Sequence, residues 1–259
     1  MKRLLVILAI GIIAALSAFA QDKPQGGGAK PADAAKTAAA MPSIDEVLTK
    51  YVKAIGGKEA HQKLTSRTAK GTFEIPAMGI SAAAELFAKA PNKSLTVIDV
   101  PGYGVVQEGF DGTVAWAMEP QNGLREKAGA ELAATKRDED FYRDLHFKEL
   151  YPKLEIAGKE SIGDREAYGM KATAADGTVD KFYFDTQSGL LVRADIERET
   201  PQGKLPIQTF FEDYKEVDGV KIPFTVRQST AAFSFVVKLT EVKHNVEISD
   251  AKFAKPSGQ

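Results

Sequence analysis

The sequence predicts a mainly β fold with some helix (α+β): one large antiparallel sheet curled into an unclosed β-barrel, with short helices covering its concave face. Apolar and polar residues alternate with a period of two along about ten to twelve segments from residue 66 to residue 242. Pairs such as Asp111-Gly112 and Asp218-Gly219 separate these segments as tight turns. Helices do not alternate with the strands, as a parallel sheet would require.

The expected elements follow in chain order. Ser43 and Glu46 form a capping box, and apolar residues then recur at helical spacing, which predicts a helix over 43–55 that ends at Gly56-Gly57. A helical segment is expected over 130–151, where the charge run 137–140 is typical of a solvated helix face. The expected strands cover 66–75, 80–88, 95–100, 105–110, 113–118, 154–162, 167–174, 179–185, 190–199, 206–214, 220–228 and 233–242.

The N-terminus has the layout of a secretory signal. A basic start at Met1–Arg3 precedes the uncharged stretch 4–20, which ends in Ala-Phe-Ala. We expect a signal peptide over 1–20, cleaved after Ala20, and a periplasmic protein; an uncleaved membrane anchor is the alternative. Residues 21–42 are rich in Gly, Ala, Pro and Lys and predict a flexible linker, and 43–259 is expected to be a single domain.

Composition excludes several classes of function. The 34 Lys and Arg residues balance 35 Asp and Glu residues and are scattered, so binding to nucleic acid is not expected. Without cysteine the chain has no disulfide and no thiolate metal ligand. His61, His146 and His244 lack metal-ligand spacing, and no Gly-x-Ser-x-Gly elbow is present. We therefore expect no cofactor, no metal and no catalysis, although dispersed carboxylates of a hydrolase would leave no motif.

The predicted sheet is larger than the helices available to cover it, which indicates a cavity or groove with apolar walls. Aromatic residues lie mostly in the expected strands, either as plain core or as the lining of a pocket for acyl chains. The candidate lining residues are Leu86, Leu95, Val97, Trp116, Phe182, Phe184, Ile196, Phe211, Phe224 and Phe235.

Three segments together resemble the LolA-like periplasmic lipoprotein carriers: Lys89-Ala90-Pro91-Asn92, Asp111-Gly112-Thr113-Val114-Ala115-Trp116 and the closing 250–258. Two more segments, 184–193 and 213–223, resemble the broader set of outer-membrane lipoprotein-sorting proteins. The resemblance spans 43–258 and implies an unclosed β-barrel with a helical lid, an apolar cavity for acyl chains, no cofactor and no catalysis. Ala90 stands where the carriers have an arginine that holds the lid closed, and alanine has no donor to replace it.

The leading hypothesis is a periplasmic carrier that binds acyl chains of lipids or lipoproteins for transfer towards the outer membrane. Its expected partners are those acyl chains, together with donor and acceptor proteins of the inner and outer membranes. The alternative is an envelope sensor that recognises lipidated or misfolded envelope proteins. Fold alone does not decide between them.

Overall fold

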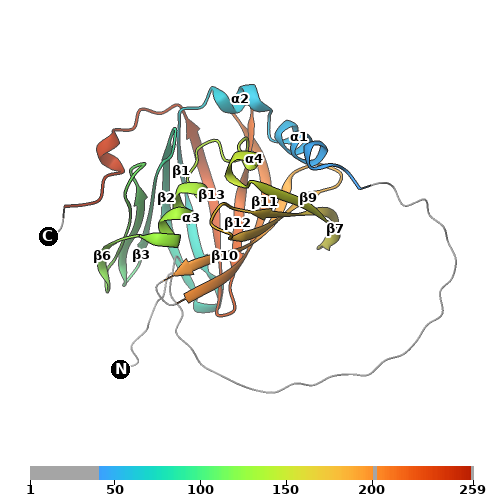
Figure 1. Cartoon of the computed structure of the whole chain (residues 1–259). Helices are drawn as coiled ribbons and strands as arrows, with labels where there is room; N and C mark the ends of the chain where they lie inside the picture. The colour runs from blue at the N-terminus through green and yellow to red at the C-terminus, as the bar shows by residue number, and fades with distance from the viewer. Residues whose placement is uncertain (1–40, 201–202, 258–259) are drawn as a thin grey trace, which may run out of the picture.

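The computed structural model of the protein describes residues 41–200 and 203–257, which form one antiparallel sheet of 13 strands with short helices (Figure 1). The expected signal peptide (1–20) and nearly all of the expected linker (21–42) lie outside the described residues. The strands are β1 (Ser66–Ile75), β2 (Ile80–Lys89), β3 (Lys93–Val100), β4 (Gly104–Phe110), β5 (Ala115–Glu119), β6 (Gly123–Glu126), β7 (Lys153–Ile162), β8 (Arg165–Thr173), β9 (Val179–Asp185), β10 (Leu191–Thr200), β11 (Gly203–Val217), β12 (Val220–Ser229) and β13 (Ser234–His244). The helices are α1 (Ile44–Ala54), α2 (Lys58–Gln62), α3 (Gly129–Asp138) and α4 (Phe147–Leu150), with 3-10 turns η1 (Pro76–Met78) and η2 (Asp250–Lys252).

The strand order shows that the sheet has two free edges. It runs β6-β5-β4-β3-β2-β1-β13-β12-β11-β10-β9-β8-β7, and the two halves of the chain meet where β1 pairs with β13, with Phe73 opposite Val237. In Figure 1 the sheet curls so that α3 lies between its two halves, while α1, α2 and α4 lie at one end. The predicted fold class, an unclosed and curled antiparallel sheet with short helices, is confirmed.

The first helix forms for the reason that the sequence predicts. The Ser43 hydroxyl accepts from the Glu46 backbone N–H, and the Glu46 carboxylate accepts from the Ser43 backbone N–H at 2.7 Å, which completes the capping box. Val47, Leu48 and Tyr51 then lie on one buried face of α1. The helix therefore begins at a fixed point and turns its apolar face to the sheet.

The segment 130–151 differs from its prediction, because it contains two helices in place of one. After α3, the Asp140 carboxylate accepts from the Tyr142 backbone N–H at 2.8 Å, a local turn that competes with helical hydrogen bonding. Residues 139–146 form a connector of turns before α4 begins. The short strand β6 has no counterpart among the expected strands, because its four residues carry little alternation.

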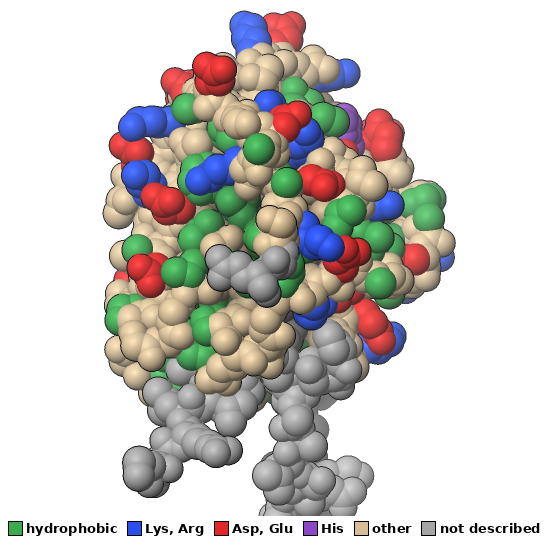
Figure 2. Space-filling view, turned by 90° about the vertical axis from the view of Figure 1, so that its left-hand side faces the viewer, with side chains coloured by type: hydrophobic (Ala, Val, Ile, Leu, Met, Phe, Trp, Pro, Cys, Tyr) green, Lys and Arg blue, Asp and Glu red, His purple; other side chains and the backbone are tan. Residues whose placement is uncertain are grey.

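Among residues 41–200 and 203–257, no helix is long and apolar enough to cross a membrane. The side of the molecule that carries the C-terminal segment shows basic and acidic side chains interspersed (Figure 2). This mixture agrees with the nearly balanced charge of the sequence.

Candidate functional site

The inner face of the sheet is the face on which α1 and α4 lie. Phe182 and Phe184 of β9 point to it; the rings of Phe147 in α4 and Phe182 are 5.0 Å apart, and those of Tyr51 in α1 and Phe184 are also 5.0 Å apart. Both pairs have edge-on geometry, which aromatic rings favour. The two helices are thus held to the sheet largely by apolar contact, and this covered face is the candidate acyl-binding site.

Seven of the ten expected lining residues lie on this inner face. The cluster beneath α1 and α4 holds four of them. A second cluster, on β1–β4 and β13, holds Phe235, and a third, beside α2, holds Phe224. Leu86 packs against both the second and the third cluster. The seven are Leu86, Phe182, Phe184, Ile196, Phe211, Phe224 and Phe235. The four beneath α1 and α4 pack against helical side chains, whose place a ligand would have to take.

The other three expected lining residues lie on the outer face. Leu95, Val97 and Trp116 form a separate cluster with Ile248 and Phe253 of the C-terminal segment. The Trp116 indole Nε1–H donates to the Phe253 carbonyl at 3.0 Å. These three residues are therefore separated from the other seven by the sheet itself, and the C-terminal segment covers them.

A glycine makes room for that outer cluster. Gly109 of β4 is paired with Trp116 of β5, and a Cβ at Gly109 would lie 2.4 Å from the indole ring. The indole lies across the position where a side chain would stand on β4. Only glycine accepts so close an approach.

A layer of buried charge lies between α3 and the inner face. The Arg198 guanidinium on β10 donates to both carboxylate oxygens of Asp138 in α3 at 2.9 Å, and to Asp180 of β9 at 2.9 Å. The Asp180 side chain is fully buried and also accepts from the Tyr151 hydroxyl at 2.8 Å. The guanidinium of Arg137, 8% exposed, stacks over the Tyr151 ring and lies 3.4 Å from Asp176.

The predicted solvated face of the charge run 137–140 is therefore wrong. Arg137 and Asp138 turn towards the sheet because Asp180 and Arg198 offer opposite charges there. The sequence predicted a cavity or groove with apolar walls, and the structure adds these polar pairs inside the curl.

A second buried charge site joins β4 to the end of the sheet. Burial raises the pKa of the Glu108 carboxyl to about 7, although the Lys127 ammonium, 3.2 Å away, acts in the opposite direction. Burial likewise raises the pKa of Glu139, at the end of α3, which hydrogen-bonds Ser94 of β3. The Glu139 carboxyl thus connects the end of α3 to the first half of the sheet.

The three segments that carry the LolA-like resemblance meet in space. Lys89 donates to the Ile248 carbonyl at 2.8 Å and forms an ion pair with Asp250 at 2.7 Å. Lys93 pairs with the same Asp250 carboxylate at 2.7 Å. With the Trp116 to Phe253 hydrogen bond, these contacts fasten the C-terminal segment to the outer face.

Ala90, which replaces the expected lid arginine, lies in a turn that contacts the covering connector through its backbone. The Pro91 carbonyl accepts from the Phe141 backbone N–H at 2.9 Å. The guanidinium of Arg67 lies 5.8 Å from the centre of the Phe141 ring. The turn and the connector are therefore joined without an arginine at position 90.

The other two motif segments hold α1. A Cβ at Gly189, in the turn after β9, would lie 2.8 Å from the Lys50 side chain, and a Cβ at Gly56 would lie 2.2 Å from the Gly219 carbonyl. The Lys221 backbone N–H donates to the Ile55 carbonyl at 2.8 Å. Both turns thus pack directly against α1 and its end.

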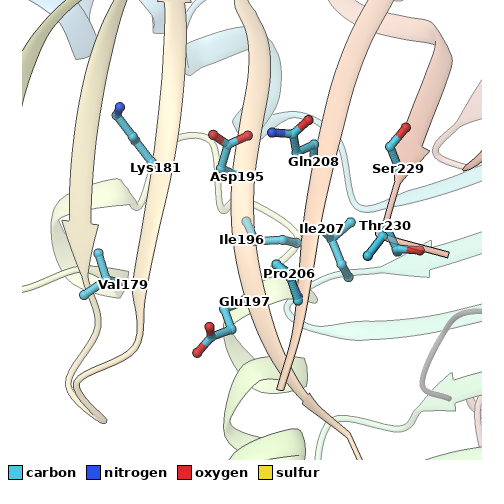
Figure 3. Close-up of a pocket in the computed structure, with 11 residues that line it drawn as sticks. Val179, Lys181, Asp195, Ile196, Glu197, Pro206, Ile207, Gln208, Ser229 and Thr230 are labelled. Atoms are coloured by element: carbon cyan, nitrogen blue, oxygen red, sulfur yellow. The ribbon is translucent and has the colours of Figure 1, made fainter. Parts of the chain in front are cut away.

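Open hollows lie around the sheet. One of about 530 Å³ is a groove across β9 to β12, where Lys181, Asp195, Gln208 and Ser229 form a row across four strands (Figure 3). Its other lining residues are Val179, Ile196, Glu197, Pro206, Ile207, Thr230 and Ala231. Of the expected lining residues, Ile196 borders this groove.

The histidines have structural partners that sequence spacing did not show. His146 pairs with Asp140 at 2.8 Å, His244 with Asp218 at 3.0 Å, and His61 contacts the Ile55 carbonyl at 3.2 Å. Burial lowers the pKa of His244. In the part of the chain that the structure describes, no group of three or more His, Cys, Asp or Glu residues could hold a metal ion.

Comparison with known proteins shows the fold. No family model matches the chain, and no curated protein matches it in sequence. A DUF1329 family protein from Desulfovibrio piger matches with a TM-score of 0.56 at 15% identity, over 82% of this chain and 97% of that one. A LolA superfamily protein from Nitrosomonas europaea gives 0.54 at 16% identity, over 83% and 99%. A structure named for an outer membrane lipoprotein-sorting protein domain from Vibrio parahaemolyticus gives 0.57 at 12% identity, over 82% and 98%. The chain therefore has a LolA-like fold.

Proposed function

We propose that the protein is a periplasmic carrier that binds acyl chains of lipids or lipoproteins on the inner face of its sheet and transfers them towards the outer membrane. The observation that carries the proposal is the apolar inner face, covered by short helices that side-chain packing holds in place. The likeness to a structure named for lipoprotein sorting supports it. The N-terminal pattern, a basic start and an uncharged stretch ending in Ala-Phe-Ala, supports the periplasmic location.

Acyl chains suit this face because binding needs no polar recognition. Each methylene group removed from water contributes about 0.8 kcal/mol, so about ten methylene groups contribute about 8 kcal/mol before ordering costs. The ligand would replace contacts that α1 and α4 now make with Phe182 and Phe184. Binding therefore exchanges one apolar cover for another, and we infer a binding protein in preference to an enzyme.

Native mass spectrometry of the protein purified from membranes tests the proposal. We expect co-purified lipid, and we expect a fluorescent fatty acid to compete with it. Ile196→Ser, on the inner face, should weaken fatty-acid binding, whereas Val97→Ser, on the outer face, should leave it unchanged; both residues are partly buried. If no lipid co-purifies and the fluorescent fatty acid does not bind, the carrier proposal is refuted.

The sensor remains the second hypothesis, and the same variants separate it from the carrier. A sensor would co-purify with a specific transmembrane protein, and that association would survive Ile196→Ser. A carrier would instead lose its cargo. The donor and acceptor membrane proteins of a carrier would be found by crosslinking the lipid-loaded form.

A further inference from the structure

Two hollows meet at Lys50 of α1. The first, here called the basic hollow, has a volume of about 460 Å³ and is lined by Lys50, Lys53, Ala54, Gly56, Ser188, Glu216 and Lys221. The second, here called the apolar hollow, has a volume of about 170 Å³ and is lined by Pro42, Glu46, Val47, Lys50, Tyr168, Phe184, Asp185, Thr186 and Gly189. Lys50 belongs to both, and the turn with Ser188 and Gly189 separates them.

The apolar hollow borders the proposed acyl-binding face. Its wall includes Phe184 and Val47, which belong to the inner-face cluster beneath α1. The turn at Gly189 packs tightly on Lys50, so the two hollows share one wall. A molecule with a chain in the apolar hollow would hold its polar end close to the basic hollow.

Positive charge gathers at the basic hollow without matching negative charge. Lys50 donates to the Thr186 carbonyl at 2.7 Å, which leaves two of its three N–H groups, and among the described residues Lys50, Lys53 and Lys221 form no salt bridge. Glu216 is the carboxylate in this hollow, so three positive charges face one negative charge. In contrast, Lys89 and Lys93 both reach Asp250.

The acidic residues of the apolar hollow are engaged elsewhere. Glu46 accepts from Ser43 in the capping box. Asp185 accepts from the backbone N–H groups of Gln187 and Ser188 within its own turn, and these hydrogen bonds lower the pKa of Asp185 against the effect of burial. Among the described residues, neither carboxylate forms a salt bridge with Lys50, Lys53 or Lys221.

We propose that the basic hollow binds a phosphate group, which in the carrier is the headgroup of the lipid whose chain enters beside Phe184. This inference rests on the proposed acyl binding. The lysines supply ammonium donors for the phosphate oxygens, and the apolar hollow supplies the start of a path for the chain. The cargo would then be an anionic, phosphate-bearing lipid.

Titration calorimetry with the full chain tests the proposal with three probes: dodecyl phosphate, dodecyl maltoside and inorganic phosphate. The two detergents share one chain and differ in headgroup charge. We expect dodecyl phosphate to bind roughly tenfold more tightly than dodecyl maltoside at low salt, and the difference to shrink as salt is added. Competition between inorganic phosphate and dodecyl phosphate would show that both bind at the same site. Weaker binding of inorganic phosphate than of dodecyl phosphate would identify a lipid headgroup as the source of the phosphate, and equal or tighter binding would identify free phosphate.

The variants make the test specific. Lys53→Ala with Lys221→Ala should abolish the preference for dodecyl phosphate, and Glu216→Gln should increase it. Lys58→Ala with Lys63→Ala removes the same charge from exposed positions at the same end of the molecule, outside both hollows, and should leave the preference intact. If the two double variants behave alike, the phosphate site is refuted. Equal binding of both detergents would refute the phosphate site but leave the proposed acyl binding intact. Binding of inorganic phosphate without binding of either detergent would refute acyl binding but leave the phosphate site intact.

Discussion

Glu108 of β4 makes the stability of the protein depend on pH. Burial raises the pKa of its carboxyl from 4.5 to about 7 in the folded state, so the folded protein holds the proton more tightly than the unfolded chain does. The resulting stabilisation is complete below pH 4.5 and is lost as the pH rises through about 7. Its upper bound is about 3 kcal/mol.

Glu108→Gln should remove this pH dependence. Urea unfolding measured from pH 5 to pH 8 should show a smaller fall in the free energy of unfolding for the variant than for the natural protein, by roughly 2 kcal/mol. The absolute stability also changes, because Lys127 loses its partner, so the slope against pH is the quantity to compare. An unchanged slope would contradict the assigned burial of this carboxyl.

At the residue scale, periodicity cannot choose between the two faces of a strand when both are apolar. On β3, Leu95 and Val97 alternate with Ile98 and Val100, and both sets are covered. Periodicity identifies the strand but gives no reason to choose one set for the inner face. The decisive contact comes from Phe253, far along the chain, whose closing segment covers Leu95. Only the fold could assign Leu95, Val97 and Trp116 to the outer cluster.

At the scale of elements, α3 depends on one arginine of the sheet. Arg198→Ala would leave the fully buried Asp180 carboxylate and the partly buried Asp138 carboxylate without the guanidinium that pairs with both. We expect a loss of about 3–5 kcal/mol in the free energy of unfolding, or a local release of α3. Amide hydrogen exchange separates these results, since release raises exchange in α3 while β9 stays protected.

The matched control is Arg227→Ala on the outer face. Its partner Glu212 is exposed, so the loss should stay below about 1 kcal/mol. Equal effects of the two substitutions would show that the buried charge layer does not hold α3.

The contrast between α1 and α3 shows which elements the sequence could predict. The capping box and apolar stripe of α1 are local signals, and both hold in the structure. The charged face of α3 looks solvated because its partners, Asp180 and Arg198, lie far along the chain. The hydrogen bond from the Tyr142 backbone N–H to the Asp140 carboxylate interrupts the helix. This signal is local, but the same residues also fit a helical pattern, so the sequence did not show which would form.

At the scale of the whole molecule, the motifs that carry the resemblance make contacts between segments that are distant in the chain. They join the C-terminal segment to the outer face and α1 to the turns at Gly189 and Gly219. These contacts join parts of the fold to one another, so the motifs predict the fold but not the ligand, although Phe184 of one motif segment also lies on the inner face. The turn at Ala90 illustrates the point, since backbone groups make its contact with the connector.

If acyl chains enter by displacing the helical cover, weakening that cover should strengthen binding. The Tyr51 hydroxyl on α1 donates to Asp144 of the connector at 2.7 Å, so Tyr51→Phe removes one hydrogen bond between two covering segments and leaves the inner face unchanged. We expect the form with the helical cover in place to lose about 1–2 kcal/mol of stability, and fatty-acid affinity to rise by up to roughly tenfold, because less of the binding energy is spent on displacing the cover.

Tyr183→Phe makes the same chemical change on the outer face, where the hydroxyl contacts Asp195 at 3.0 Å, and should leave the affinity unchanged. Fluorescent fatty-acid titrations of the two variants decide the matter: equal affinities would mean that acyl chains reach the inner face without moving α1.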